Sequence, residues 1–558
     1  MKNILIAIRS IFKKGRHNVM KIVSLGIGLA VGLVLIAKVY FEQSYDDFYP
    51  DRDRVYQVWA KYQQNGGELK DYPQTSGGIA PTMQQQIPEI ETVTRYTSFG
   101  DWTFTMTDTK MKYSGRCIIA DSCFFDILPR PMLIGNAKEV LSTPMYVLIS
   151  SRIAKNIGGD VIGKNFTVDS SPGRTMTIGG VFEEVPENSH SRYDVIVSMA
   201  SAGRFMWEGS PTNMLGNDRY ISYVKLHKGV NPLALEEQVH TFVNSYFPPE
   251  EQQKTGFNIG FSFHELDGLH KELPQVKRMT WILSLLAFAL IFTAVMNYIL
   301  IVISSIVNRS KEVAVHKCYG ASENNIHGMM FGEALVHIVL SLILALLLIL
   351  AFRGTVEELL ATSLDSLLLS NGSLVLLGIC ILVFFVSGFM PGSLYARIPV
   401  ASAFRNYREN KRIWKKALLL VQFVATGFLV TMLVFVARQY TFMVNDRPGY
   451  AYENLAYCGL AGVDSTSRAK ILDEVMRLPG VVAATTVYQL PFEHASGNNI
   501  LLPGETQELF NIADLYWVGN GYLDMMEIPV IQGRSFTENV TNSREVMVDR
   551  RFVEKMNW

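Results

Sequence analysis

Five long apolar blocks divide the chain, and each reaches or exceeds the roughly 18 residues that a helix needs to cross a hydrocarbon core. The first block carries no charge until Lys38. Because a lipid core offers no water to the backbone, each crossing segment must satisfy its own hydrogen bonds, as a helix does. The blocks lack the alternation of membrane β-strands. The predicted spans are residues 22–40, 281–306, 331–351, 374–394 and 417–437.

Two simpler interpretations of these blocks are disfavoured. A cleaved signal peptide has an apolar core of about 7 to 15 residues and a small-x-small cleavage site, and the first block is longer and has no clear site. Buried core helices of a soluble protein are rarely free of charge over about 20 residues, and five in one chain would be exceptional. The first block is therefore predicted to be an uncleaved anchor.

Basic residues lie at one end of successive spans, which predicts the orientation of the chain. They precede the first span (Arg9, Lys13, Lys14, Arg16, Lys21), follow the second (Arg309, Lys311, Lys317) and follow the fourth (Arg397, Arg405, Arg408, Lys411, Arg412, Lys415, Lys416). The segment 353–372 carries Glu357, Glu358 and Asp365 with one arginine, as expected of the opposite face. Residues 1–21, 307–330 and 395–416 are therefore predicted to be cytoplasmic, and 43–277 and 440–558 extracytoplasmic. The chain is thus predicted to be a multi-pass membrane protein with its N-terminus in the cytoplasm.

Composition agrees with a chain that is part membrane and part water-exposed. Of its 558 residues 49% are hydrophobic, and the mean hydropathy is +0.16. The 51 basic residues equal the 51 acidic residues, which gives no reason to expect binding of nucleic acid.

The segment 43–277 mixes strand-like and helix-like patterns and predicts an α+β domain. Alternating stretches such as 103–106 and 174–182 are punctuated by glycine and proline, and 81–86 has a helical pattern. Residues 158–165 (GGDVIGKN) nearly spell a phosphate loop, but Asn165 replaces the Mg²⁺-binding hydroxyl. A glycine turn between a helix and a strand is the preferred interpretation.

Other candidate chemistry in the extracytoplasmic segment is weak. His264, Glu265, Asp267 and His270 have zinc-ligand side chains, but their spacing matches no standard motif, so no metal or cofactor is predicted. Cys117 and Cys123 lie where disulfides form, yet their separation on strand-like sequence does not ensure Cα atoms within about 7 Å, so pairing stays open. The remaining cysteines are scattered, and no catalytic cluster is legible, so no enzyme activity is predicted.

The chain contains an internal repeat at a shift of about 400 residues. Residues 124–128 (FFDIL) resemble 522–526 (YLDMM), and 148–157 resemble 547–556. The same shift places the first span on the fifth. The predicted architecture is thus an α-helical membrane protein with large α+β extracytoplasmic domains, built as a tandem repeat of one span, an external domain and three spans. The second copy is incomplete, and an intact version is expected to have eight spans.

The segment that follows the second span carries the strongest functional signal. The stretch 307–322 reads as a short basic amphipathic helix with Val313 and Lys317 one turn apart, and this helix ends at Gly320, which can adopt a left-handed conformation. Ser322 can cap a new helix that starts at Glu323. On composition alone, a basic cytoplasmic loop is the favoured explanation of these charges.

The run from Arg309 to Ser322 (RSKEVAVHKCYGAS) resembles the signature that follows the second span in MacB- and FtsX-like permeases of ABC transporters. His316 stands where the family usually has arginine, Cys318 where it has a small residue and Tyr319 where it has an aliphatic one. Family-like pieces also occur, in order, at 46–58 (DDFYPDRDRVYQV), 125–127, 162–164 and 399–405 (PVASAFR).

The resemblance implies a function for the segment and a partner for the chain. Its coupling residues dock on an ATP-binding subunit, Glu312 and Lys317 through charge and Val313 in an apolar groove. The implied coupling residues are Arg309, Lys311, Glu312, Val313, Lys317, Gly320 and Ala321. Related exporters fuse an ATPase ahead of the first span, and only about 20 residues precede it here, so a separate ATP-binding subunit is expected.

The resemblance thus implies the permease subunit of an exporter or mechanotransmission complex for antimicrobial compounds, peptides or lipoproteins. It also implies a location in the bacterial inner membrane, with the large external domains in the periplasm. Its other partners would be membrane lipids and a periplasmic adaptor or outer-membrane component. The alternative is an FtsX-like regulatory scaffold that activates an extracytoplasmic partner without transport. The internal repeat argues against that alternative, because the cell-division type resembles four spans without a second external domain.

Overall fold

The structure is a computed structural model. It describes residues 17–64, 67–169, 171–216, 219–368, 372–396, 400, 413–445, 449–460, 463–491, 496–502, 508–536 and 545–558. Most of the predicted cytoplasmic segments 1–21 and 395–416, with most of their basic residues, lie outside these ranges. The chain forms two compact units. The helical unit comprises residues 1–53, 186–192 and 265–439, and the sheet unit comprises 54–185, 193–264 and 440–558.

All five predicted spans are helices in the structure. The described part of the chain contains five helices long and apolar enough to cross a membrane. They are α2 (Asn18–Gln43), α11 (Pro274–Ser304), α13 (Glu323–Ala351), α16 (Ser373–Ala396) and α18 (Ile413–Asn445). Each extends beyond its predicted apolar block at one end or both, because polar residues at helix ends add turns without interrupting the backbone hydrogen bonds.

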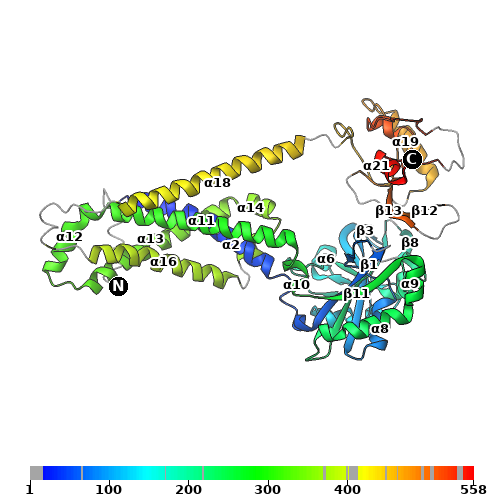
Figure 1. The fold of residues 1–558 in the computed structure, drawn as a ribbon, viewed down its shortest axis with the longest axis horizontal. Coiled ribbons are helices and arrows are strands. Elements are labelled where there is room, and N and C mark those ends of the chain that lie inside the picture. Colours follow the sequence, from blue (N-terminus) through cyan, green and yellow to red (C-terminus); the bar gives the residue numbers. More distant parts are fainter. Residues whose placement is uncertain are drawn as a thin grey trace. The chain divides into compact units, whose positions relative to one another are not determined.

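Helix α2 occupies the centre of the helical unit. It packs against α11 and α13, and α13 packs against α16, so that these four helices form a bundle (Figure 1). Small residues allow the closest approach: a Cβ added at Gly28 would lie 2.2 Å from the Cβ of Ala294, and one at Gly32 would lie 2.4 Å from Ile291 Cγ1. Without a strong hydrophobic force between helices in lipid, such close backbone packing supplies much of the association. Most described side chains of α18 are exposed.

The segment 353–372, between the third and fourth predicted spans, is partly helical. It contains two short helices, α14 (Arg353–Leu360) and α15 (Leu364–Leu368). The reason is burial of leucine: Leu367 is 1% exposed and packs with Ala37 and Phe41 of α2. The turn is fixed by Glu357, whose side chain accepts a hydrogen bond of 2.9 Å from the Leu364 amide.

The sheet unit contains an eleven-stranded mixed sheet, which confirms the α+β prediction for the first external segment. Its main path runs β11 (Phe257–Glu265), β1 (Val55–Gln64), β10 (Ile221–Leu226), β3 (Ile90–Met106), β4 (Lys112–Ala120), β9 (Val195–Ser198), β6 (Tyr146–Ser150), β8 (Ser171–Phe182) and β5 (Met132–Ile134). Strand β2 (Lys70–Tyr72) extends β1, and β7 (Asn165–Val168) pairs with β3 and β8. The β4–β9 and β6–β8 pairs are parallel, whereas the β1–β10, β10–β3, β3–β4, β6–β9 and β5–β8 pairs are antiparallel.

Helices cover the sheet and divide its apolar side chains into two cores. One core unites β1, β10 and β11 with α3 (Ile79–Gln86) and α8 (Glu236–Tyr246), and the other unites β3, β4, β6, β8 and β9 with α6 (Ser151–Ile157). Shorter helices are α4 (Phe124–Ile127), α5 (Ala137–Ser142), α7 (Ala202–Phe205) and α9 (Pro249–Thr255). The glycine-rich segment 158–165 joins α6 to β7, as predicted, with Gly158, Gly159 and Gly163 at positive φ.

The cysteines are unpaired in the structure. Cys117 lies fully buried on β4, and burial raises the pKa of its thiol well above the ordinary value. The Cys123 thiol donates to the Val93 carbonyl oxygen, 3.0 Å away. Each thiol thus has an environment of its own, and the pairing that the sequence left open is not formed.

The last part of the sheet unit contains α19 (Ser465–Met476), the hairpin β12 (Ser496–Leu501)–β13 (Glu508–Leu515), α20 (Tyr522–Met525) and α21 (Arg550–Met556). Helices α20 and α21 fall where the internal repeat aligns them with α4 and α6. The caps also correspond: the Ser150 side chain accepts from the third residue of α6, and the Asp549 side chain accepts from the third residue of α21.

A half-buried arginine joins β3 to two loops of the sheet unit and gives a first prediction. Arg95 pairs with Asp121 at 3.2 Å and donates to the carbonyl oxygens of Gly77 and Pro211. Burial raises the pKa of the Asp121 carboxyl, and Arg95 opposes that shift. We expect Arg95→Met to destabilise the unit by about 2 kcal/mol at pH 7, because an unpaired, largely buried carboxylate is left behind.

The loss of folding stability in the Arg95→Met variant should become smaller as the pH falls from 7 to 5. In the variant, the folded-state pKa of Asp121 lies above its unfolded value, so the folded state binds more protons and gains stability at lower pH. Limited proteolysis of the full-length protein at several pH values measures this effect. Arg116→Met, at an exposed position of β4, is the control and should change little. A pH-independent loss in the Arg95 variant would contradict the explanation.

Candidate functional site

The predicted coupling segment folds as helix, turn and helix. Helix α12 (Ile306–Cys318) ends at Gly320, whose φ is 86°. The Gly320 amide donates to the Lys317 carbonyl oxygen and the Ala321 amide to the His316 carbonyl oxygen, each at 3.0 Å, which is a Schellman motif. Helix α13 then starts with the Ser322 hydroxyl accepting from the Asn325 amide. These observations confirm the predicted helix end and cap.

The structure corrects the role that the sequence suggested for Val313. This side chain is 1% exposed and packs, beside Ala314, in the apolar core shared by the bundle helices. It therefore cannot fill a groove on another subunit while the bundle keeps this packing. An amphipathic pattern identifies an apolar face of a helix, but it cannot say whether that face meets its own fold or a partner.

The other predicted coupling residues take different positions. Lys311 is exposed and Glu312 half-buried, whereas Lys317 donates to the carbonyl oxygen of Ala396 at the end of α16, 2.7 Å away. Gly320 and Ala321 form the turn. Arg309 belongs to α12, and its side chain lies outside the described residues.

An exposed stripe on α12 was missed by the sequence analysis. We call it the α12 stripe; it consists of Lys311, Val315 and Tyr319, spaced four residues apart and hence on one face of the segment. Tyr319 is 89% exposed and Val315 43% exposed. The spacing was present in the sequence, but Val313 and Val315 are equally apolar, so only packing could tell the buried valine from the exposed one.

Polar side chains in the bundle interior connect α2, α13 and α11. Lys21 Nζ lies 3.8 Å from Glu333 Oε1, with side-chain exposures of 1% and 8%. One turn along α13, His337 Nδ1 lies 3.1 Å from the Tyr298 hydroxyl of α11. The sequence placed Lys21 among free basic residues before the first span, but it belongs to α2 and is buried.

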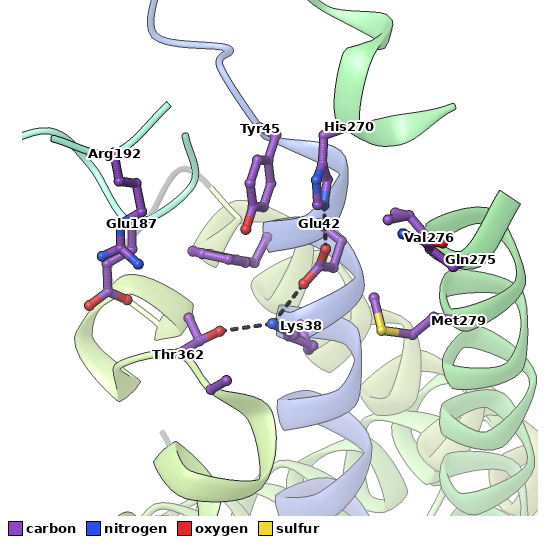
Figure 2. A pocket seen from close by; sticks show the side chains of 12 residues that line it. Lys38, Glu42, Tyr45, Glu187, Arg192, His270, Gln275, Val276, Met279 and Thr362 are labelled. Atoms are coloured by element: carbon purple, nitrogen blue, oxygen red, sulfur yellow. Dashed lines mark hydrogen bonds and ion pairs between the residues drawn. The ribbon is translucent and has the colours of Figure 1, made fainter. Parts of the chain in front are cut away.

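A second charged cluster lies at the C-terminal end of α2 (Figure 2). Glu42 accepts from Lys38 at 2.7 Å and lies 2.6 Å from His270 Nε2, while Lys38 also donates to the Thr362 hydroxyl at 2.8 Å. The ring of Tyr45 stacks on His270 with centroids 3.5 Å apart. Burial, followed by the Glu42 charge, raises the pKa of Tyr45 to about 12, so its hydroxyl stays a hydrogen-bond donor.

The loop 186–192 is fastened to the same end of α2. Asp46 is fully buried at a φ of 59°, and its carboxylate accepts from the Ser189 hydroxyl at 2.8 Å and contacts His190 Nδ1 at 2.6 Å. Asn188 donates to the Ser44 carbonyl oxygen at 2.7 Å. These contacts explain why the loop belongs to the helical unit.

The polar residues between 264 and 270 have separate structural partners. His264 stacks on Trp59 with centroids 4.1 Å apart, Asp267 pairs with Lys271 at 2.7 Å, and His270 binds Glu42. Among the described residues, no three histidine, cysteine, aspartate or glutamate side chains are grouped to hold a metal ion.

Two family models match the chain. Residues 20–242 match the MacB-like periplasmic core domain, and residues 284–400 match the FtsX-like permease C-terminal domain. No curated protein matches the chain significantly.

Solved structures are similar to part of the chain. A domain described as part of a permease protein from Porphyromonas gingivalis is 33% identical over 39% of this chain and 91% of its own, with a TM-score of 0.36. The periplasmic region of MacB from Actinobacillus actinomycetemcomitans is 16% identical over 39% and 92%, with a TM-score of 0.26. The extracellular domain of the noncanonic ABC-type transporter YknZ from Gram-positive bacteria is 10% identical over 38% and 98%, with a TM-score of 0.27.

Membrane-length helices and an extracytoplasmic α+β domain inserted after the first of them define the class, a membrane protein with an extracytoplasmic domain. The capped helix between the second and third spans lies within the matched permease domain. The chain belongs to the MacB/FtsX-like family of ABC transporter permeases. The domains that match are not catalytic in this family, and the family implies an ATP-binding subunit as partner.

Proposed function

We propose that the chain is the membrane subunit of an ABC-type exporter or mechanotransmission complex driven by a separate ATP-binding subunit. Its N-terminus lies in the cytoplasm, its external domains lie in the periplasm, and its cargo is an antimicrobial compound, a peptide or a lipoprotein. The proposal rests mainly on α12. This short capped helix lies between two spans and has an exposed, partly apolar stripe.

The α12 stripe is the part of the segment suited to docking. Tyr319 and Val315 offer an exposed apolar surface, which is costly to keep in water and marks interaction sites. Lys311 adds a charge at the edge of that surface. On the inward side, Val313 and the Lys317–Ala396 hydrogen bond fix α12 to the bundle, so that a push on the stripe moves the spans. A partner that contacts the stripe differently in its two nucleotide states would shift the bundle between conformations.

Mutation of the α12 stripe should strongly reduce capture of the ATP-binding subunit. We expect Tyr319→Ala combined with Lys311→Glu to lower, by about tenfold or more, the amount of the neighbouring-gene ATP-binding subunit that co-purifies in detergent. A tenfold change in affinity corresponds to about 1.4 kcal/mol of binding free energy. Loss of a central aromatic contact together with reversal of a charge typically costs more than that. ATPase activity of the complex should fall in parallel.

The matched control is Tyr452→Ala, which removes an exposed tyrosine from the predicted extracytoplasmic segment after α18. If the stripe variant still captured the ATP-binding subunit, docking would have to use another surface. Failure of the wild-type protein to capture the subunit would overturn the proposal as a whole.

We also propose that α18 and the segment 449–558 begin a second repeat unit. The support is the order helix, hairpin, short helix and capped helix, which follows that of α2, β3–β4, α4 and α6. In this proposal α18 corresponds to α2, and its exposed apolar side chains face lipid or further spans.

A further inference from the structure

A cavity lies within the helical unit at the C-terminal end of α2 (Figure 2). Its volume is about 360 Å³, within the usual range for pockets that hold a small ligand. The walls come from the last turn of α2, the first turns of α11, the turn between α14 and α15, and the loop 186–192. This is the end at which α2 leaves the membrane for the extracytoplasmic domain, so the cavity lies at the level of lipid head groups.

One wall of the cavity carries hydrogen-bond donors. Arg192 is exposed and makes no ion pair with any described residue. The Tyr45 hydroxyl, which points into the same space in Figure 2, also has no hydrogen-bond partner among the described residues. Lys38 has two such partners, Glu42 and Thr362, for its three donors. Three side chains therefore offer donors to an anionic oxygen.

The net charge of the lining argues for a ligand with both signs. Lys38 and Glu42 compensate each other at 2.7 Å. Arg192 and Glu187 remain, one of each sign. The structure gives Glu187 one hydrogen bond, from the Ser363 amide at 3.0 Å to Oε2, so its other oxygen can accept from a ligand ammonium.

Another part of the lining is apolar and consists of Phe41, Val276, Met279 and Ala361, which we call the apolar wall. Phe41 and Val276 are buried and Met279 is half-buried. A purely polar solute would leave this wall in contact with water, whereas the first part of an acyl chain would cover it.

We propose that this cavity binds the head group of a zwitterionic phospholipid, with Arg192, Tyr45 and Lys38 donating to its phosphate and Glu187 accepting from its ammonium. The apolar wall receives the start of an acyl chain. This inference rests on the spans and the cavity alone, and it is independent of the ATP-binding subunit and of any transported cargo.

The test is native mass spectrometry of the purified full-length protein in detergent with added lipids. The probes are dioleoylphosphatidylethanolamine, dioleoylphosphatidylglycerol and the chain-free glycerophosphoethanolamine. We expect the wild-type protein to retain the ethanolamine lipid at about fivefold lower concentration than the glycerol lipid. Arg192→Gln should weaken its retention about tenfold, since one charge-assisted hydrogen bond is lost. Tyr45→Phe, which keeps the ring that stacks on His270, should weaken it about threefold.

Arg278→Gln is the matched control, an exposed arginine on α11 outside the cavity lining. Its lipid retention should equal that of the wild type. Four results would overturn the proposal: an Arg192 variant that binds like the wild type, an equal loss in the Arg278 variant, equal retention of the two lipids, or binding of the chain-free compound as tight as that of the lipid. The last result would instead indicate a site for soluble phosphate compounds.

Discussion

Leucine at Gly28 is expected to prevent assembly of the helical bundle. A Cβ at this position would lie 2.2 Å from the Cβ of Ala294, far inside van der Waals contact, and the α11 backbone lies directly behind it. Overpacking a well-filled interface typically costs about 1 to 3 kcal/mol, and a whole isobutyl group exceeds what small shifts can absorb. Helices α2 and α11 would have to separate, which would remove the close packing that holds them together in lipid.

The measurement is the yield of monodisperse protein in detergent and its thermal unfolding. Gly378→Leu is the matched control, because Gly378 lies on α16 and a Cβ there meets no atom within 4 Å. We expect little protein from the Gly28 variant and nearly wild-type yield and melting from the control. Equal behaviour of the two variants would mean that α2 and α11 do not approach each other as described.

Removal of one member of the Lys21–Glu333 pair should be the next most damaging change. Both side chains are buried in the bundle, so Glu333→Leu leaves the Lys21 ammonium without its carboxylate. Breaking a buried pair in this way typically costs about 3 to 5 kcal/mol. In a membrane segment, an uncompensated charge also pulls water or head groups inward.

A double variant distinguishes the effect of breaking the Lys21–Glu333 ion pair from the general effect of a mutation in α13. Lys21→Met with Glu333→Leu removes both charges, and we expect it to recover most of the stability, because apolar replacements of a buried ion pair are often neutral. The control Glu323→Leu, at an exposed position in the first turn of α13, should change stability by less than about 1 kcal/mol. A double variant as unstable as Glu333→Leu would show that the two charges do not act as a pair.

The two predictions converge on α2. Glycines bring this helix against α11, and a charge pair holds its N-terminal end to α13. At its C-terminal end, Lys38 binds the α14–α15 turn and Glu42 binds α10 (Gly268–Lys271). Asp46, just after the helix, binds the loop 186–192. A helix fixed at both ends moves as a rigid element. Under the proposed function, it would carry a displacement of the bundle to the extracytoplasmic end.

The sequence predicted the five spans and the helix end and cap between the second and third spans, because the determinants of both are local. Twenty apolar residues predict a span wherever they occur, and Gly320 and Ser322 end and start helices through their own backbone and side-chain atoms. The strand-like stretches at 103–106 and 174–182 also form strands for a local reason, the alternating sequence pattern of a strand.

Only the tertiary structure decided which side chains face the interior. Val313 and Val315 are the same residue type two positions apart, yet one lies in the core and the other on the surface. In the sequence, Lys21 is one of several basic residues before the first span. In the structure, it lies beside Glu333, which is more than 300 positions later in the chain. The cavity at the end of α2 likewise gathers residues from four distant segments. Burial and charge pairing depend on neighbours that folding brings together from far apart in the chain, so no local pattern could have revealed them.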